Sequence, residues 1–469
     1  AAVVFASGYS EAGTPEAQQK ENELLEIAQK YDMRIMGPNC GGYINNIDNI
    51  YAWGLESDFD IKHLDAGISM ISQSGAICGI MQQLDYLKMA YSVSCGNSNA
   101  IELEDYFEYF IEDESTKVLT IYMEGVKNPP KFVHCLKMAA QKRKPVVILK
   151  GGKSEKGRIS AASHTGNLAG SGEVFEIIVK RYGGILVSSQ NELIATAKTL
   201  LNMNGQFPSG GRFACLTGSG ADATISADLS ETVGIELPDF EKQTVQNIQH
   251  ELATFATAKN PLDGTTDMGK DINTMANLLK AFEDDKNIDS VIFHTEHFIE
   301  GEDDFTWFIV NAMTRAREFG CKKPCFVIPT YECSKNKQVL EKLDYLNVSI
   351  LPSGKAGYEV LAKLATYFTY DQEQASLDIS VPRKKLPSGR ISLSEAESKE
   401  ELGKHGLPVQ PLRVVASKNS LEEAIREIGY PIAMKISSPD ILHKTEAGGV
   451  RLNINNLDEA LEAYDQIIM

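Results

Sequence analysis

A histidine, His164, lies in a stretch of small residues that runs from Ser160 to Ser171. A neutral imidazole nitrogen is a competent nucleophile near pH 7, where a lysine is protonated. The small neighbours leave the ring accessible, and a helical pattern from Glu173 to Tyr182 offers free backbone N–H groups to a phosphate. The residues fit a phosphohistidine loop, but by themselves they fit an ordinary loop histidine equally well.

Two kinds of group would complete such a site. Glu124 follows a strand-like run, so its carboxylate is placed to accept a hydrogen bond from an imidazole and to stabilise a cationic phosphoimidazole. The alternative is a solvated glutamate at a strand end. Two Gly-containing segments leave a strand and open a helix, where backbone N–H groups cradle phosphate, although ordinary N-caps look the same. These phosphate-binding candidates are Ser72, Gln73, Ser74, Gly75, Gly218, Ser219, Gly220 and Ala221.

Parallel sheets must position these groups, because short apolar runs alternate with helical patterns over residues 66–205 and again over 210–370. The pattern predicts doubly wound α/β domains with sites at the carboxyl ends of the strands. The expected strands of the first domain are 67–71, 91–94, 118–123 and 145–150, and its expected helices include 75–88, 102–112 and 130–140.

Composition limits the function. The 469 residues carry a net charge of −18, which argues against nucleic acid or an anionic membrane as a partner. No apolar run approaches the roughly 20 residues that span a bilayer, and no secretory segment opens the chain, so a cytoplasmic protein is expected. Eight cysteines lack disulfide or zinc spacing, and His294 and His297 follow a strand rather than share a helix face, so no metal site is predicted.

Several motifs resemble one family. The segment 163–170, Ser-His-Thr-Gly-Asn-Leu-Ala-Gly, resembles the active-site loop of the ADP-forming (NDP-forming) acyl-CoA synthetases, which include acetate–CoA ligases and are relatives of succinyl-CoA synthetase. Gly37-Pro38-Asn39-Cys40 and Asn260-Pro261-Leu262-Asp263 are similar to further motifs of that family, and 429–451 resembles the first half of an ATP-grasp domain.

The resemblance implies a multi-domain α/β chain. Residues 1–58 would be the C-terminal part of a Rossmann-like CoA-binding domain, and 66–205 a flavodoxin-like domain with the phosphohistidine loop. Residues 210–370 would form a second flavodoxin-like domain, 371–389 a linker and 390–469 the N-terminal part of an ATP-grasp domain. The chain starts without methionine in a strand-like run and stops at Met469 within a helical pattern, so both ends are expected to be cuts through domains.

The resemblance also assigns roles to residues. His164 would carry the phosphoryl group, Glu124 would stabilise it and His443 would be a second carrier. Lys435 lies in an apolar strand-like run, where an unpaired ammonium is costly, and the matching ATP-grasp lysine contacts nucleotide phosphates. The residues expected to bind CoA are Ser7, Gly8, Glu11, Asn39 and Cys40.

The implied function is an acid–thiol ligase that reversibly converts a carboxylic acid, CoA and ATP into acyl-CoA, ADP and phosphate, with Mg2+ as a further cofactor. A homo-oligomer or a subunit of a larger assembly is expected. The alternatives are a protein acetyltransferase that carries this assembly, and a non-catalytic CoA-sensing module. The presence of both His164 and Glu124 argues against both of them.

Overall fold

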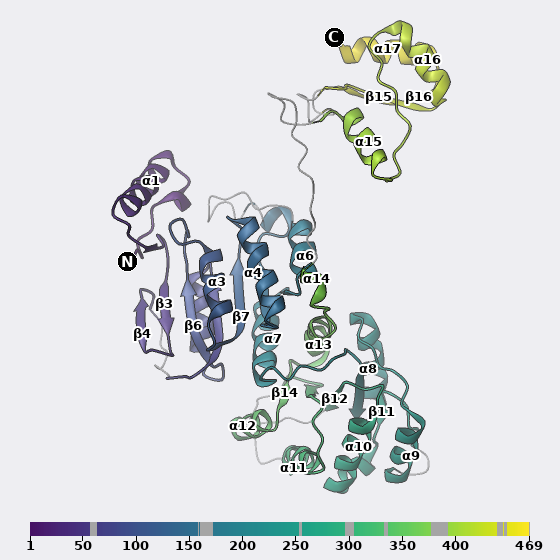
Figure 1. Ribbon diagram of the computed structural model, residues 1–469. Coiled ribbons are helices and arrows are strands. Elements are labelled where there is room, and N and C mark those ends of the chain that lie inside the picture. Colours follow the sequence, from purple (N-terminus) through teal and green to yellow (C-terminus); the bar gives the residue numbers. More distant parts are fainter. Residues whose placement is uncertain are drawn as a thin grey trace. The chain divides into compact units, whose positions relative to one another are not determined.

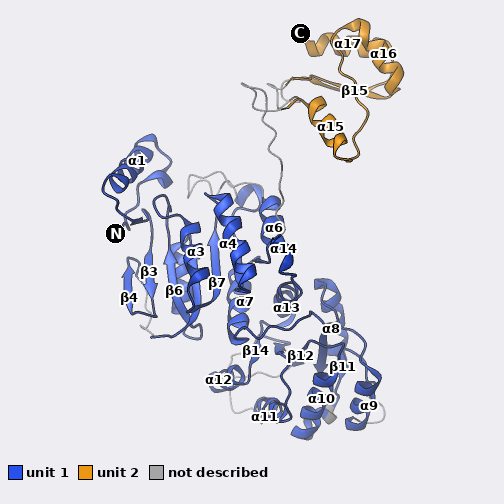
Figure 2. Cartoon of the chain, viewed as in Figure 1, with its two compact units in different colours: residues 1–378 blue, residues 379–469 orange. Residues whose placement is uncertain are grey.

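The computed structural model describes residues 1–56, 63–157, 159, 172–252, 256–295, 304–332, 336–376, 393–438, 444 and 448–468 (Figure 1). The chain divides into two compact units, residues 1–378 and residues 379–469 (Figure 2). The predicted histidines His164 and His443 lie outside the described residues.

The chain begins with a small parallel pair of strands, β1 (Ala2–Val3) and β2 (Ile35–Met36). Between them lie a short 3-10 turn, η1 (Ser10–Ala12), and the helix α1 (Pro15–Lys30). The Thr14 side chain accepts a hydrogen bond from the Ala17 N–H at 3.2 Å, so Thr14 is the N-cap of α1. Pro15 then fills the first helical position, where the missing N–H leaves no hydrogen bond unmade.

A seven-stranded sheet follows. Its strand order is β4 (Ile50–Trp53), β3 (Gly42–Asn45), β6 (Met89–Ser94), β5 (Gly67–Ser72), β7 (Thr116–Met123), β8 (Val146–Lys150) and β9 (Ile185–Val187). The strands β6, β5, β7, β8 and β9 are parallel, which confirms the predicted α/β architecture.

The hairpin β3–β4 differs from the predicted division of the chain. Residues 1–58 were assigned to the preceding domain, but β3 pairs antiparallel with β6, with Gly42 opposite Ser94 and Asn45 opposite Tyr91. Without β3, the strand β6 would be the edge of the parallel sheet, with unpaired backbone N–H and C=O groups. The strand β3 pairs with these groups. The sequence pattern of a hairpin does not say which sheet it joins.

Helices cover both faces of this sheet. The helices α3 (Leu103–Glu112), α4 (Pro129–Gln141) and α6 (Gly172–Arg181) pack in one apolar cluster, with Phe107, Phe132 and Val179. The helices α2 (Gly75–Gln83) and α7 (Gln190–Asn202) contribute to a second cluster on the other face, with Met81 and Leu193. The helix α2 ends at Gln83, five residues before its predicted end.

The second sheet of this unit has five parallel strands in the order β11 (Leu262–Asp263), β10 (Phe213–Thr217), β12 (Ser290–Thr295), β13 (Cys325–Pro329) and β14 (Val348–Ile350). Its helical elements are α8 (Gly220–Val233), α9 (Lys242–Glu251), η2 (Thr266–Gly269), α10 (Ile272–Asp284), α11 (Asp304–Glu318), α12 (Lys337–Tyr345), α13 (Gly354–Phe368) and α14 (Glu373–Ser376). The repeat of the first architecture is as predicted.

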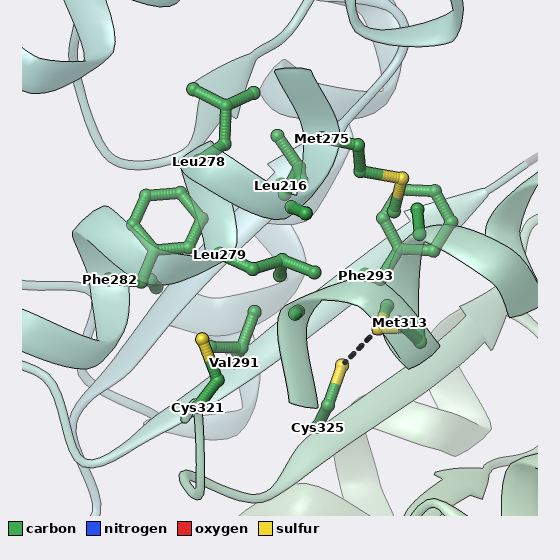
Figure 3. Packing of buried hydrophobic residues seen from close by; sticks show 14 of the residues in the cluster. Leu216, Met275, Leu278, Leu279, Phe282, Val291, Phe293, Met313, Cys321 and Cys325 are labelled. Carbon is green, nitrogen blue, oxygen red and sulfur yellow. Dashed lines mark hydrogen bonds between the residues drawn. The ribbon is translucent and has the colours of Figure 1, made fainter. Parts of the chain in front are cut away.

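Each face of the second sheet has its own core. Figure 3 shows part of one core, in which Leu279 and Phe282 of α10 lie near Val291 of β12. On the other face, Phe326 and Tyr358 belong to the same apolar cluster as Met81 of the seven-stranded domain. The two sheets therefore share a continuous core, to which α7 and α13 both contribute.

The second unit is smaller. It contains α15 (Glu395–Lys404), α16 (Lys418–Ile428), the antiparallel strands β15 (Ile432–Lys435) and β16 (Val450–Ile454), and α17 (Leu457–Ile468). Its core joins Leu421 and Ile425 of α16 to Ile454 and Ala460. Across the described parts of both units, no helix has the length and apolar character needed to cross a membrane. The seven cysteines described are free and buried.

The turn after β6 makes a close backbone contact with the segment after β2. Gly96 has φ +60°, and a Cβ atom there would lie 2.3 Å from the Pro38 carbonyl oxygen and 2.5 Å from that of Asn39. The next residue, Asn97, donates its backbone N–H to the Pro38 oxygen at 2.9 Å. Only glycine therefore fits both the conformation and the space at position 96.

Replacing Gly96 with alanine is expected to lower the free energy of unfolding of the first unit. The left-handed conformation alone costs about 1–2 kcal/mol, and relief of the backbone clash adds about 1–3 kcal/mol. Gly205→Ala is the matched control, because Gly205 has φ +76° with no atom within 4 Å of its Cβ position. Both variants share the cost of the left-handed conformation, so Gly96→Ala should unfold at a lower urea concentration than Gly205→Ala only because of the backbone clash. Equal midpoints would show that residues 38–39 yield at no cost.

Candidate active site

Glu124 follows directly on the last residue of β7, and its two carboxylate oxygens differ. Oε1 accepts a hydrogen bond from the Tyr122 hydroxyl at 3.1 Å. Oε2 is buried and has no hydrogen-bond partner among the described residues. An unpaired buried carboxylate oxygen is costly, so Glu124 is suited to receive a donor such as an imidazole N–H. Burial, together with the Glu124 charge, raises the pKa of Tyr122 to about 12, so this hydroxyl stays protonated.

Gln73 holds the main chain around Glu124. Its Oε1 accepts the backbone N–H of Glu124 at 2.5 Å and that of Gly125 at 3.3 Å. The backbone N–H of Gln73 donates to the backbone carbonyl oxygen of Tyr122 at 3.1 Å. The sequence predicts that Gln73 binds phosphate. In the structure its side-chain oxygen ties the start of α2 to the end of β7, and phosphate binding by Gln73 stays a prediction.

Lys150, at the end of β8, supports the same segment. Its Nζ donates to the backbone oxygens of Glu124 at 2.6 Å and Gly151 at 2.5 Å, and burial lowers the pKa of the ammonium group. Sequence reasoning missed Lys150 and Tyr122. The signal was present for Lys150, because a lysine that ends an apolar strand needs a polar partner.

An open pocket of about 550 Å³ lies next to this group. Its size is within the range typical of small-molecule sites. The pocket is bounded by the first turn of α2, the ends of β7 and β8, and the start of α7. Its lining residues are Ile77, Tyr122, Leu149, Lys150, Gly151, Ser188, Ser189, Gln190 and Asn191. Apolar and hydroxyl-bearing side chains thus meet beside Tyr122, the residue that contacts Glu124.

The two predicted phosphate-binding segments have the same local geometry. At the end of β5, the Ser72 hydroxyl donates to the Ser74 oxygen at 2.6 Å and accepts the Ser74 N–H at 3.0 Å. At the end of β10, Thr217 does the same with Ser219, at 2.9 Å and 3.4 Å. In both segments the N-cap serine is extended and makes no side-chain cap. The first N–H groups of α2 and α8, which begin at Gly75 and Gly220, therefore lack a capping side chain.

The charges around the two helix starts differ. The first turn of α2 contains no acidic residue. The first turn of α8 follows Gly218 and Ser219 and includes Ala221 and the buried Asp222. The Asp263 carboxylate lies 3.1 Å from where a Cβ of Gly220 would be. Because carboxylates repel an anion at a helix N-terminus, the start of α2 has the more favourable charge environment for an anion.

The residues predicted to bind CoA separate into three groups. Ser7 and Gly8 are exposed, on the approach to η1. Glu11 accepts the Gly8 N–H at 2.6 Å and the Asn97 amide at 2.6 Å, and the Asn39 amide donates to the Asn97 Oδ1 at 3.3 Å. Asn97 therefore links Glu11 to Asn39.

Cys40 points into the interior. It is 5% exposed, its thiol donates to the Val4 oxygen at 3.4 Å, and burial raises its pKa. The structure thus surrounds this thiol with protein rather than presenting it at the surface.

Lys435, the predicted nucleotide ligand, ends β15 in the second unit. The prediction treated it as a buried ammonium, but its side chain is 40% exposed and its Nζ lies 3.2 Å from Glu395 Oε1. The reason is that β15 belongs to a two-stranded sheet and its own residues alternate between half-buried and exposed. An apolar sequence does not establish burial in so small a sheet.

His294, which the sequence raised as a possible metal ligand, is buried on β12. Its Nδ1 lies 2.7 Å from the Ser226 hydroxyl and 3.2 Å from the Tyr358 hydroxyl. Within the ranges that the structure describes, no three His, Cys, Asp or Glu side chains gather as metal ligands.

Comparisons with known proteins agree with this architecture. Residues 65–200 match the succinyl-CoA ligase like flavodoxin domain, and residues 384–469 match an ATP-grasp domain. The acetate–CoA ligase [ADP-forming] I of Archaeoglobus fulgidus is 31% identical over 474 residues, 98% of this chain and 66% of that protein. A trans-feruloyl-CoA synthase from an unknown prokaryotic organism is 30% identical over 474 residues, covering 100% of this chain and 66% of that protein.

A solved structure shows the fold. The dinucleotide forming acetyl-coenzyme A synthetase 1 of Ca. Korarchaeum cryptofilum, in complex with phosphate and ADP, has a TM-score of 0.67 and 24% identity. The match covers 80% of this chain and 78% of that one. The chain spans about 66% of the length of the two curated relatives. From the matching domains and the relatives, the chain belongs to the family of ADP-forming acyl-CoA synthetases.

Proposed function

We propose that the protein is an acid–thiol ligase that reversibly forms acyl-CoA from a carboxylic acid, CoA and ATP, releasing ADP and phosphate. The observation that carries the proposal is the buried, unpaired Oε2 of Glu124 at a strand end beside an open pocket. The relatives support it, since their names specify CoA ligation and, for the Archaeoglobus fulgidus protein, formation of ADP.

The proposed mechanism passes a phosphoryl group through His164. An imidazole nitrogen attacks the phosphorus of an acyl phosphate, so that an N–P bond forms, the P–O bond breaks and the carboxylate oxygen leaves with the electron pair. Glu124 accepts the other ring N–H and stabilises the cationic phosphoimidazole. The uncapped start of α2, from Ser74 to Gly75, stabilises charge on the phosphoryl oxygens. In the thioester-forming direction ATP phosphorylates His164 and leaves as ADP, and the phosphohistidine passes its phosphoryl group to the carboxylate of the acid. The CoA thiol then attacks the acyl carbon of the acyl phosphate, so that a C–S bond forms, the C–O bond to the phosphate breaks and phosphate leaves.

The remaining assignments belong to the same proposal. His443 is a second phosphoryl carrier and Lys435 contacts the nucleotide phosphates. CoA lies against the segment of Ser7, Gly8 and Glu11, with Asn39 and Cys40 behind it. Mg2+ is a further cofactor, and when bound it would neutralise charge on the nucleotide phosphates. The protein acts in the cytoplasm, as a homo-oligomer or as a subunit of a larger assembly.

The acid is best identified by assay, because one relative is named for acetate and the other for a feruloyl group. Acyl-CoA formation from a panel of acids of increasing size, with CoA and ATP, tests the proposed function directly. No acyl-CoA from any acid, with the complete protein and Mg2+, would contradict it.

His164 is predicted to be the phosphorylated residue. The complete protein incubated with labelled ATP and Mg2+ should take up label that acid removes and base retains, because a phosphohistidine N–P bond is acid-labile. His164→Asn should abolish both the label and acyl-CoA formation. If His164→Asn still forms acyl-CoA at the full rate, the phosphohistidine mechanism is wrong.

Glu124→Gln is predicted to reduce turnover by roughly two orders of magnitude while CoA binding is unchanged. The substitution keeps the size of the side chain but removes the charge facing the phosphoimidazole, and an oriented electrostatic interaction of this kind is worth about 3 kcal/mol. Steady-state kinetics and CoA titration measure the two effects. Glu112→Gln, which removes an exposed ion pair with Lys142, is the control. Equal turnover in both variants would make Glu124 an ordinary strand-end residue.

A further inference from the structure

One side chain in the turn after β6, that of Asn97, joins this turn to the segments before α1 and after β2. Its amide nitrogen lies 2.6 Å from Glu11 Oε2, 2.9 Å from Glu21 Oε2 and 3.2 Å from the Ser10 hydroxyl. Its Oδ1 accepts a hydrogen bond from the Asn39 amide at 3.3 Å. Asn97 is 7% exposed, so these contacts are largely shielded from water.

Two carboxylates that share the Asn97 amide orient the backbone ahead of α1. Glu11 Oε1 accepts the N–H groups of Gly8 and Tyr9, at 2.6 Å and 3.2 Å. The fully buried Glu21 accepts the next N–H, that of Ser10, at 2.8 Å. The shape of this backbone therefore depends on two negative charges that are held close together.

Lys127, in the loop between β7 and α4, compensates this charge and holds the turn. Burial lowers the pKa of its ammonium group, and the nearby carboxylate of Glu21 opposes that shift. The ammonium donates to the backbone oxygen of Asn97, to that of Ser98 at 3.3 Å and to the side-chain oxygen of Asn99. Because neighbouring carboxylates repel each other and a buried one is costly without a cation, the Lys127 charge stabilises this arrangement.

The main chain of Lys127 is held by a different contact. Glu104 Oε1 accepts the N–H groups of Lys127 and Asn128, at 3.1 Å and 3.2 Å. Asn128 in turn caps α4 by accepting the Lys131 N–H at 3.2 Å. The Lys127 side chain can therefore be replaced without releasing the loop that follows Glu124.

We propose that Lys127 is a positioning residue for CoA, which acts through Asn97 to hold the CoA segment, Ser7 to Glu11, in the shape that binds the cofactor. The inference rests on the proposed function in taking this segment as the CoA site. Without the ammonium group, the Asn97 oxygen loses this donor and the two carboxylates lose the neighbouring positive charge. CoA binding then weakens, whereas phosphorylation of His164 is retained.

The first test is the steady-state kinetics of Lys127→Met in the complete protein. The KM for CoA should rise roughly tenfold, a change of about 1.4 kcal/mol. The kcat at saturating CoA should stay within about twofold, because loss of binding alone raises KM without lowering kcat. Lys127→Arg, which keeps the charge and the N–H donors, should recover most of the affinity.

Lys144→Met is the matched control for this variant. The Lys144 ammonium also donates to two backbone oxygens, those of Phe110 at 2.9 Å and Asp113 at 2.6 Å, but these belong to α3 and its C-cap. Its KM for CoA should be that of the unaltered protein. An unchanged KM in Lys127→Met, or an equal rise in both methionine variants, would overturn the proposal.

A direct binding measurement separates this inference from the proposed function. Calorimetric titration with CoA needs no turnover, so it reports the effect of Lys127→Met even where no acid is converted. Weaker CoA binding by Lys127→Met, without acyl-CoA formation by the unaltered protein, would support the positioning role and count against the ligase. No CoA binding by the unaltered protein would overturn both.

A second variant, Asn97→Asp, does not depend on how Lys127→Met folds. It keeps the size of the side chain and the backbone oxygen that Lys127 contacts, but it places a third carboxylate next to Glu11 and Glu21. The repulsion should weaken CoA binding roughly tenfold or more. If Asn97→Asp binds CoA as tightly as the unaltered protein in the same titration, the proposal is wrong.

Discussion

The hydrogen bonds that Gln73 Oε1 accepts from Glu124 and Gly125 hold the candidate site together. They join the start of α2 to the end of β7, so the helix N-terminus and the carboxylate are positioned by one side chain. The Lys150 ammonium supports the same segment by donating to the backbone oxygen of Glu124. Because this network satisfies the main chain of Glu124 and leaves its Oε2 unpaired, the carboxylate can still accept a donor.

The same strand-to-helix turn occurs in both domains of the first unit. At the ends of β5 and β10, the hydroxyl of Ser72 or Thr217 hydrogen-bonds to the backbone of the serine two residues later. The helix that follows has no side-chain cap. The surroundings then make the two copies unequal. Asp222 and Asp263 bring negative charge to the start of α8, whereas the first turn of α2 has none. Shared backbone geometry therefore does not imply equal affinity for an anion.

Two lysines with the same sequence signal have opposite environments. Lys150 and Lys435 each end an apolar strand. Lys150 lies in a central strand covered on both faces, and its ammonium is buried against backbone oxygens. Lys435 lies in a two-stranded sheet, and its ammonium is exposed and shares Glu395 with two other lysines. The number of neighbouring strands decides which environment a terminal lysine has, and this number is a property of the assembled sheet.

The sequence by itself determined the alternation of strands and helices, the two doubly wound domains and the placement of Glu124 at a strand end, because these follow from local periodicity and from the rule that parallel strands present their carboxyl ends together. It also located the helix start at Gly75 and a Gly-rich helix N-terminus within residues 217–222. Only the tertiary structure decided that the β3–β4 hairpin joins the sheet at β6, that the Gln73 side-chain oxygen contacts the main chain of Glu124, and that Glu395 gathers three lysines. These outcomes depend on contacts between segments far apart in the chain, which periodicity and residue type do not encode.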